Sequence, residues 1–216
     1  MKATLTVLIS TLVLSLSLIL AGCSSTAALS MIQTSNTYAN KLPLKAAVYI
    51  PPELSNREVL TSPTTFVCSA WKAKVNSGNG YYTAIESGLS AALQTVDVIK
   101  TAPTPELAKT GGYNLLVSVA LSNENSSVTV NEGFLTNTIN SQFQVSFTLT
   151  FSDSLGRSLY SYTANGSGFN NISGDCSDIA KCAKAAMETA LKQVADYIAQ
   201  STYGSAQLSD YAKKAN

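Results

Sequence analysis

The chain has 216 residues with 14 basic and 13 acidic side chains, a formal net charge of +1, and no histidine. A charge near zero without a basic stripe argues against nucleic acid as a partner, and the lack of histidine removes the commonest general base and the commonest metal ligand. Charged residues are only 12% of the chain, about half the usual share. Serine, threonine, asparagine and glutamine must therefore supply much of the polar surface.

The first 22 residues are typical of an export signal. Lys2 precedes an apolar run, "LTVLISTLVLSLSLIL", from Leu5 to Leu20. This run is shorter than the ~20 residues that a helix needs to cross the hydrocarbon core of a bilayer. A basic start, a short apolar stretch and small residues at its end together describe a cleavable signal rather than a permanent span.

The segment ends in Leu20-Ala21-Gly22-Cys23, which resembles the lipobox of bacterial lipoproteins. The resemblance implies cleavage between Gly22 and Cys23 and attachment of a diacylglycerol and a further acyl chain to Cys23. No cofactor other than this covalent lipid is expected. Two or more acyl chains hold a protein stably at a membrane. The alternative is an uncleaved signal anchor with an incidental cysteine.

Ser24 follows the cysteine, in place of the aspartate that commonly retains such proteins at the inner membrane of enteric bacteria. The resemblance therefore implies a lipid-anchored protein on the periplasmic face of the outer membrane. Residues 23–42 are small and polar, which predicts a flexible lipidated tether. About 194 residues remain after cleavage, enough for one domain with a core. We expect this domain over 43–203 and a polar C-terminal tail over 204–216.

The first part of the domain carries weak signals. Residues 47–50, "AVYI", predict an opening strand that ends at two prolines. Residues 53–80 hold strand-like pieces around Phe66-Val67 and from Trp71 to Val75, without a defined arrangement. Apolar residues at helical spacing then predict a helix over 81–96, and "DVIKT" predicts a short strand after it.

The second part carries the strongest strand signals. Residues 113–122 and 142–151 alternate apolar and polar side chains, as a strand with one wet face does. Residues 127–133 are expected to follow 113–122 as a separate partner strand, and "SDSLGR" predicts a hairpin turn after 142–151. A long helix with a broad, alanine-rich apolar stripe then follows from residue 177. Together these elements predict an α+β two-layer sandwich, with a mostly antiparallel sheet of about four to six strands and two helices packed on one face.

Four cysteines are present, and acylation of Cys23 leaves three for disulfide chemistry. Cys176 stands just before a predicted helix start and Cys182 lies in the second turn, and a residue just outside a helix N-terminus folds over the first turn. A local Cys176–Cys182 bridge in the oxidising periplasm is therefore the first choice. The alternative pairs Cys68 with one of these two. No metal site is expected, because the spacing lacks C-x-x-C and no histidine completes the ligands.

Beyond the lipobox, the order of elements resembles that of the YajG-type lipoproteins of Gram-negative bacteria. The matching features are an opening strand, a helix before the strand "YNLLVSVALS", and two further strands. The segment "GSGFNNIS", leading into a long alanine-rich helix, and the tail "SDYAKKAN" complete the match. This family implies an architecture and a membrane address but no reaction.

The sequence offers no catalytic constellation. "SGNG" lacks the rest of a phosphate-binding loop, and Asp175 and Asp178 suit the capping of a helix start. We therefore expect no enzyme and no catalytic residues, but a binding or assembly module of the cell envelope whose polar sheet face contacts an envelope protein. The alternatives are a peptidoglycan or glycan hydrolase with two facing carboxylates, and a subunit of a secretion or surface-appendage assembly.

Overall fold

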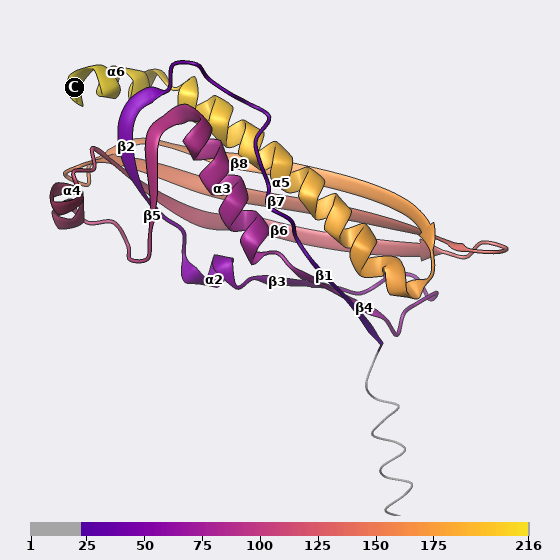
Figure 1. The fold of residues 1–216 in the computed structure, drawn as a ribbon. Helices are drawn as coiled ribbons and strands as arrows, with labels where there is room; N and C mark the ends of the chain where they lie inside the picture. The colour runs from indigo at the N-terminus through magenta and orange to yellow at the C-terminus, as the bar shows by residue number, and fades with distance from the viewer. Residues whose placement is uncertain (1–22, 216) are drawn as a thin grey trace, which may run out of the picture.

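Two β-sheets form the body of the protein, and two long helices cover one face of the larger sheet (Figure 1). The computed structural model describes residues 23–215, so the predicted signal segment and Gly22 lie outside the described residues. In chain order the elements are β1 (Ser24–Ala28), β2 (Leu42–Tyr49), α2 (Pro52–Ser55), β3 (Glu58–Thr61), β4 (Lys72–Asn76), α3 (Gly78–Ala92), β5 (Leu93–Ile99), α4 (Pro105–Gly111), β6 (Leu115–Asn131), β7 (Asn137–Asp153), β8 (Ser158–Gly174), the 3-10 helix η1 (Cys176–Asp178), α5 (Ile179–Tyr203) and α6 (Ala206–Ala215).

The larger sheet has five strands in the order β5-β2-β6-β7-β8. Strand β2 lies parallel to β5 and β6, whereas the long strands β6, β7 and β8 pair antiparallel. The predicted α+β class, the strand number and the two covering helices are therefore confirmed. The predicted hairpin turn is also present between β7 and β8, where Gly156 takes a left-handed φ of 81°.

Strand β6 corrects the prediction of two separate strands over 113–122 and 127–133. It runs without a break from Leu115 to Asn131, with a register shift between Leu121 and Asn123. The asparagine- and serine-rich stretch therefore forms a bulge rather than a turn. Strand β7 alternates along its whole length and offers hydrogen-bonding partners on both sides of the bulge, so pairing resumes beyond it.

The predicted helix over 81–96 is present as α3, but it begins at Gly78 and ends at Ala92. Strand β5 follows at once, so Leu93 and Val96 belong to the sheet rather than to the helix. The β-branched residues of "TVDVI" favour an extended chain, which explains the early helix end.

The core lies between the larger sheet and helices α3 and α5. The inner face of β7 contributes Phe143, Phe147 and Phe151, all fully buried. Helix α5 rests closely on β8, where a Cβ added at Gly168 would lie 1.8 Å from the carbonyl oxygen of Ala186. Small residues on both surfaces thus allow the helix backbone to approach the strand backbone.

The smaller sheet is made from segments to which the sequence assigns no arrangement. Its order is β1-β4-β3, with β1 parallel to β4 and β3 antiparallel to β4. The piece from Trp71 to Val75 is largely β4, as predicted. The piece around Phe66-Val67 is a loop, so that strand prediction is wrong; both residues lie in the turn that leads to Cys68.

The predicted polar tail over 204–216 is mostly helix α6. Its Leu208 and Ala212 are buried, and the Tyr211 hydroxyl donates to the carbonyl oxygen of Asn114 at 2.7 Å. One apolar face therefore docks the C-terminal helix onto the body. Within residues 23–215, no helix is both long and apolar enough to cross a membrane.

Candidate functional site: the anchor end

Cys23, the predicted lipidation residue, lies exposed at the start of the smaller sheet. Its carbonyl oxygen accepts a hydrogen bond from the backbone N–H of Lys72 at 3.0 Å, and β1 begins at the next residue. From Ser24 to Ala28 the chain pairs in parallel with β4. The cysteine is thus joined to the folded body without an intervening linker.

Ser25 fastens β1 to the long helix. The residue is 9% exposed, and its hydroxyl oxygen accepts a hydrogen bond from the backbone N–H of Ala180 at 3.1 Å. Ala180 is the second residue of α5, and the first N–H groups of a helix have no partner within the helix. A side chain of β1 therefore supplies one of the caps of α5.

The segment from residue 29 to residue 41, here called the strap, lies along helices α3 and α5 (Figure 1). Leu29 and Ile32 are buried against the core. The backbone N–H of Ile32 donates to the hydroxyl of Thr83 at 2.9 Å, and that of Thr34 donates to the hydroxyl of Ser87 at 2.7 Å. Both acceptors are on α3, so the strap is bound along that helix.

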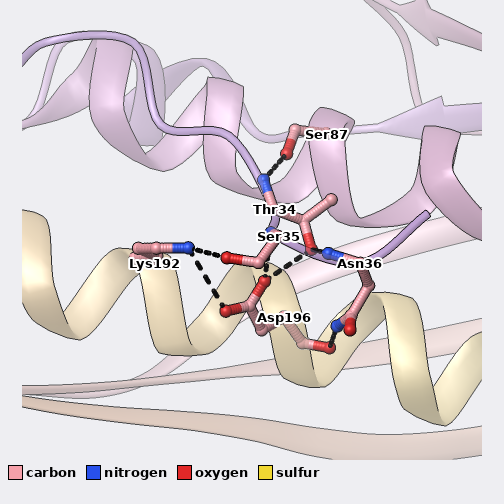
Figure 2. A network of polar contacts seen from close by, with 6 residues as sticks. All are labelled: Thr34, Ser35, Asn36, Ser87, Lys192 and Asp196. Atoms are coloured by element: carbon pink, nitrogen blue, oxygen red, sulfur yellow. Dashed lines mark hydrogen bonds and ion pairs between the residues drawn. The ribbon is translucent and has the colours of Figure 1, made fainter.

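Asp196 of α5 holds the middle of the strap (Figure 2). Its Oδ1 accepts hydrogen bonds from the Thr34 hydroxyl and the Ser35 backbone N–H, both at 2.6 Å, and its carbonyl oxygen accepts from Asn36 Nδ2 at 2.9 Å. Lys192 lies 3.6 Å from Asp196 Oδ2 and also contacts the hydroxyl of Ser35. Partial burial raises the pKa of Asp196, but the hydrogen bonds and Lys192 outweigh it and leave the pKa lowered.

These contacts correct the prediction of a flexible tether over 23–42. The described part of that segment is a strand followed by a bound strap. The small, polar composition suggested a flexible segment. The strap is instead held mostly by hydrogen bonds, which small polar residues make readily. The sequence signal that could have found it is the spacing of Leu29 and Ile32, three residues apart; both are buried, whereas Met31 between them is exposed.

The disulfide joins Cys68 to Cys176, so the predicted local Cys176–Cys182 bridge is wrong and the alternative with Cys68 is the one observed. Cys182 is a free thiol on the face of α5 that points to the sheet, where it contacts the carbonyl oxygens of Ile139 and Asn170. Burial raises the pKa of this thiol. Cys176 lies on the other side, in η1, and therefore faces the 62–71 loop instead.

Several distant segments meet around this disulfide and form what we call the anchor end. They are Cys23, the loop 62–71 and the start of α5, and the tip of the β6–β7 hairpin, residues 132–136, extends beyond them (Figure 1). The loop is tied to the hairpin because the backbone N–H of Val130 donates to the Thr65 hydroxyl at 3.0 Å. Asn137, the first residue after the tip, pairs with Gly174, two residues before Cys176.

Asp175 and Asp178 act as predicted for a helix start. The Asp175 carboxylate accepts from the backbone N–H of Ser177, and the Asp178 carboxylate accepts from the backbone N–H of Asp175, which together form a capping box. The hydrogen bonds from Ser177 lower the pKa of Asp175. Across residues 23–215, no group of three or more cysteine or acidic side chains is placed so that it could hold a metal ion.

The outer face of the larger sheet is polar, as expected. Rows of hydroxyl and amide side chains cross β7 and β8: Ser146 donates to Asn165 at 2.7 Å, and the hydroxyls of Thr148 and Thr163 lie 3.1 Å apart. The neighbouring hydroxyls of Thr150 and Ser161 lie 3.3 Å apart. This surface, which we call the polar face, offers donors and acceptors without a charge.

A second polar cluster joins the two sheets. Arg57 binds Glu124 through two nitrogens, at 2.9 and 3.2 Å, and the hydroxyl of the fully buried Tyr81 donates to the same carboxylate at 2.6 Å. Burial and the bond to Glu124 raise the pKa of Tyr81 far above its ordinary value. Glu124 follows the bulge of β6, so the bulge aims its carboxylate at α3 and at the loop before β3.

Comparison with known proteins gives matches of low sequence identity and low TM-score. No family model matches the chain, and no curated protein matches it, so the resemblance to YajG-type lipoproteins stays a prediction. Among solved structures, a putative neuraminyllactose-binding hemagglutinin homolog from Helicobacter pylori is 11% identical over 83% of this chain and 97% of its own, with a TM-score of 0.46.

Two further solved structures superpose less well. The PelC dodecamer from Paraburkholderia phytofirmans is 15% identical over 74% of this chain and 93% of its own, with a TM-score of 0.31. A minor lipoprotein from Acinetobacter baumannii is 9% identical over 76% of this chain and 93% of its own, with a TM-score of 0.37. At these scores the similarities assign neither a family nor a function.

Proposed function

We propose that the protein is a lipoprotein anchored through Cys23 to the periplasmic face of the outer membrane, where it acts as a non-catalytic binding or assembly module. The observation that carries this proposal is the sequence Leu20-Ala21-Gly22-Cys23 behind a short apolar run. The exposed Cys23 at the edge of the folded body is consistent with it, because an acylated cysteine must reach lipid.

The anchor is tested by two matched cysteine substitutions. Cys23→Ala should abolish incorporation of labelled palmitate and move the protein out of the membrane fraction. Cys182→Ala, which removes the other free thiol of the described residues, should change neither property. Normal labelling and membrane fractionation of Cys23→Ala would overturn the proposal.

The outer-membrane address is tested separately. Ser24 is exposed, so Ser24→Asp leaves the fold intact while supplying the residue that retains such lipoproteins at the inner membrane. In an enteric host, density-gradient separation of the two membranes should show the wild-type chain in the outer membrane and the variant in the inner. An unchanged distribution would contradict the address but not the lipid anchor.

The polar face is the surface we propose for an envelope protein partner. Its hydroxyl and amide groups suit hydrogen bonding at a protein interface, and its lack of charge suits a partner that is not strongly charged. A photo-crosslinking residue in place of Thr163, on this face, should capture one defined protein in cells. The same residue in place of Gln207, an exposed position on α6, is the control. Recovery of uncrosslinked protein alone from the Thr163 position would refute this surface.

A further inference from the structure

The anchor end carries an apolar surface that no other part of the described chain covers. Phe66 is 94% exposed, Leu135 is 87% exposed and Phe134 is fully exposed. Phe66 lies in the loop 62–71, and the other two form the tip of the β6–β7 hairpin. We call these three residues the tip patch. Large apolar side chains exposed together mark an interaction surface.

The position of Cys23 decides what this patch faces. The residue after Cys23 is already paired with β4, and Lys72, whose N–H binds the carbonyl oxygen of Cys23, is only four residues from Cys68. A lipid on Cys23 therefore holds the anchor end at the bilayer surface with no spacer to separate them. Whatever side chains this end presents must then meet the lipid headgroups.

The geometry points to a second, non-covalent membrane contact: we propose that the tip patch inserts into the leaflet that holds the Cys23 lipid. This inference rests on the proposed lipid anchor. Phenylalanine and leucine are the side chains that insert at the boundary between headgroups and acyl chains. Together with Cys23, the loop and the hairpin tip supply separate points of contact, which fix the orientation of the domain as one acylated residue alone does not.

The segments that carry the patch hold too little charge to favour an electrostatic partner, and the loop 62–71 has no charged residue. Residues 132–136, "EGFLT", contain Glu132 as their one charged residue and no basic one. The contact is therefore apolar, and it should form on zwitterionic lipid and persist at high salt, since screening acts on charges. The disulfide from Cys68 to Cys176 holds the loop beside the start of α5, and this covalent link restrains the loop that carries Phe66.

The experiment uses the mature acylated protein in phosphatidylcholine vesicles with brominated acyl chains. Trp71 is the one tryptophan of the chain, so Trp71→Phe removes the native tryptophan fluorescence. Phe134→Trp in this variant then places a single fluorescent reporter in the tip patch. The introduced indole should lose emission through bromine quenching and shift to shorter wavelength on reconstitution. Leu155→Trp in the same background is the control, because Leu155 is 64% exposed at the β7–β8 turn, the other end of the strands.

Each outcome separates the two proposals. Vesicle flotation with quenching of the Phe134→Trp reporter alone supports the tip patch. Flotation without quenching overturns the tip patch and leaves the anchor standing. A shift to shorter wavelength that grows with protein concentration without vesicles overturns it in favour of a second copy. If the protein carries no lipid and does not float with the vesicles, both the lipid anchor and the tip-patch proposal are overturned.

Discussion

The hydroxyl of Ser25 accepts a hydrogen bond from the backbone N–H of Ala180, 155 residues further along the chain. The second residue after the proposed lipid attachment is therefore fastened to the first turn of α5, the longest helix within residues 23–215. Ser25→Ala should lower the free energy of unfolding by about 1 kcal/mol, the usual cost of losing a helix cap. Denaturant unfolding measures this change. Ser24→Ala is the matched control, because Ser24 is exposed, and an equal loss there would refute the cap.

The strap should depend on the charge of Asp196. Its pKa in the folded protein lies below its ordinary value of 3.8, so its contribution to stability is complete above that value and is lost as the pH falls through the lowered folded pKa. Asp196→Asn should therefore weaken the strap at neutral pH and flatten the acid side of the stability curve. Melting temperatures from pH 2 to pH 7, compared with the wild type, measure both effects.

Limited proteolysis gives an independent test of the strap. At neutral pH, Asp196→Ala should expose the segment around Ser35 to cleavage that the wild-type protein resists, because the variant loses the bonds from Thr34 and Ser35. The substitution Asp210→Ala, on the exposed face of α6, serves as the control. Equal resistance of all three proteins would show that the buried Leu29 and Ile32 and the bonds to Thr83 and Ser87 hold the strap without the Asp196 carboxylate.

The Cys68–Cys176 disulfide should stabilise the fold by up to about 5 kcal/mol, since it closes a loop of 108 residues. Reduction should lower the melting temperature of the wild-type protein and of Cys182→Ala by similar amounts. It should leave the melting temperatures of Cys68→Ser and Cys176→Ser unchanged, because these variants have no native bridge to lose. A reduction effect that disappears in Cys182→Ala would contradict the observed pairing.

Gly168 permits the close approach of α5 to β8. Gly168→Ala should lower the free energy of unfolding by about 2 to 3 kcal/mol, because the added methyl group would meet the carbonyl oxygen of Ala186 and push the helix outward. Ser167→Ala is the control, since its side chain is exposed on the opposite face of the same strand. A cost for Gly168→Ala no larger than the control's would show that the helix shifts freely.

The predictable parts of the fold are those where one short segment contains the whole signal. Strand β7 alternates apolar and polar residues without a fault, and α5 repeats alanine and larger apolar residues at helical spacing. Each pattern needs no knowledge of its partner. The β6 bulge could not be predicted because its asparagines and serines also suit a turn, and only the length of β7 decides between the two.

The candidate site was harder to predict because it is made of contacts between distant residues. Cys23 could be identified from its four-residue context, but nothing in that context shows that Ser25 caps a helix. Thr34 and Asp196 are both ordinary polar residues in sequence, and 162 positions separate them. The disulfide was mispredicted for the same reason: proximity along the chain favoured Cys182, whereas its side chain points into the core.

Strands β6, β7 and β8 each contain 17 residues, and at ~3.3 Å per residue each is about 55 Å long. With the hairpin tip in the leaflet, as proposed, these strands extend away from the bilayer, and the β7–β8 turn is their end farthest from the lipid. The polar face then extends along these strands away from the lipid and does not lie against the bilayer surface. A partner bound there would stand in the periplasmic space at a height set by the strand length.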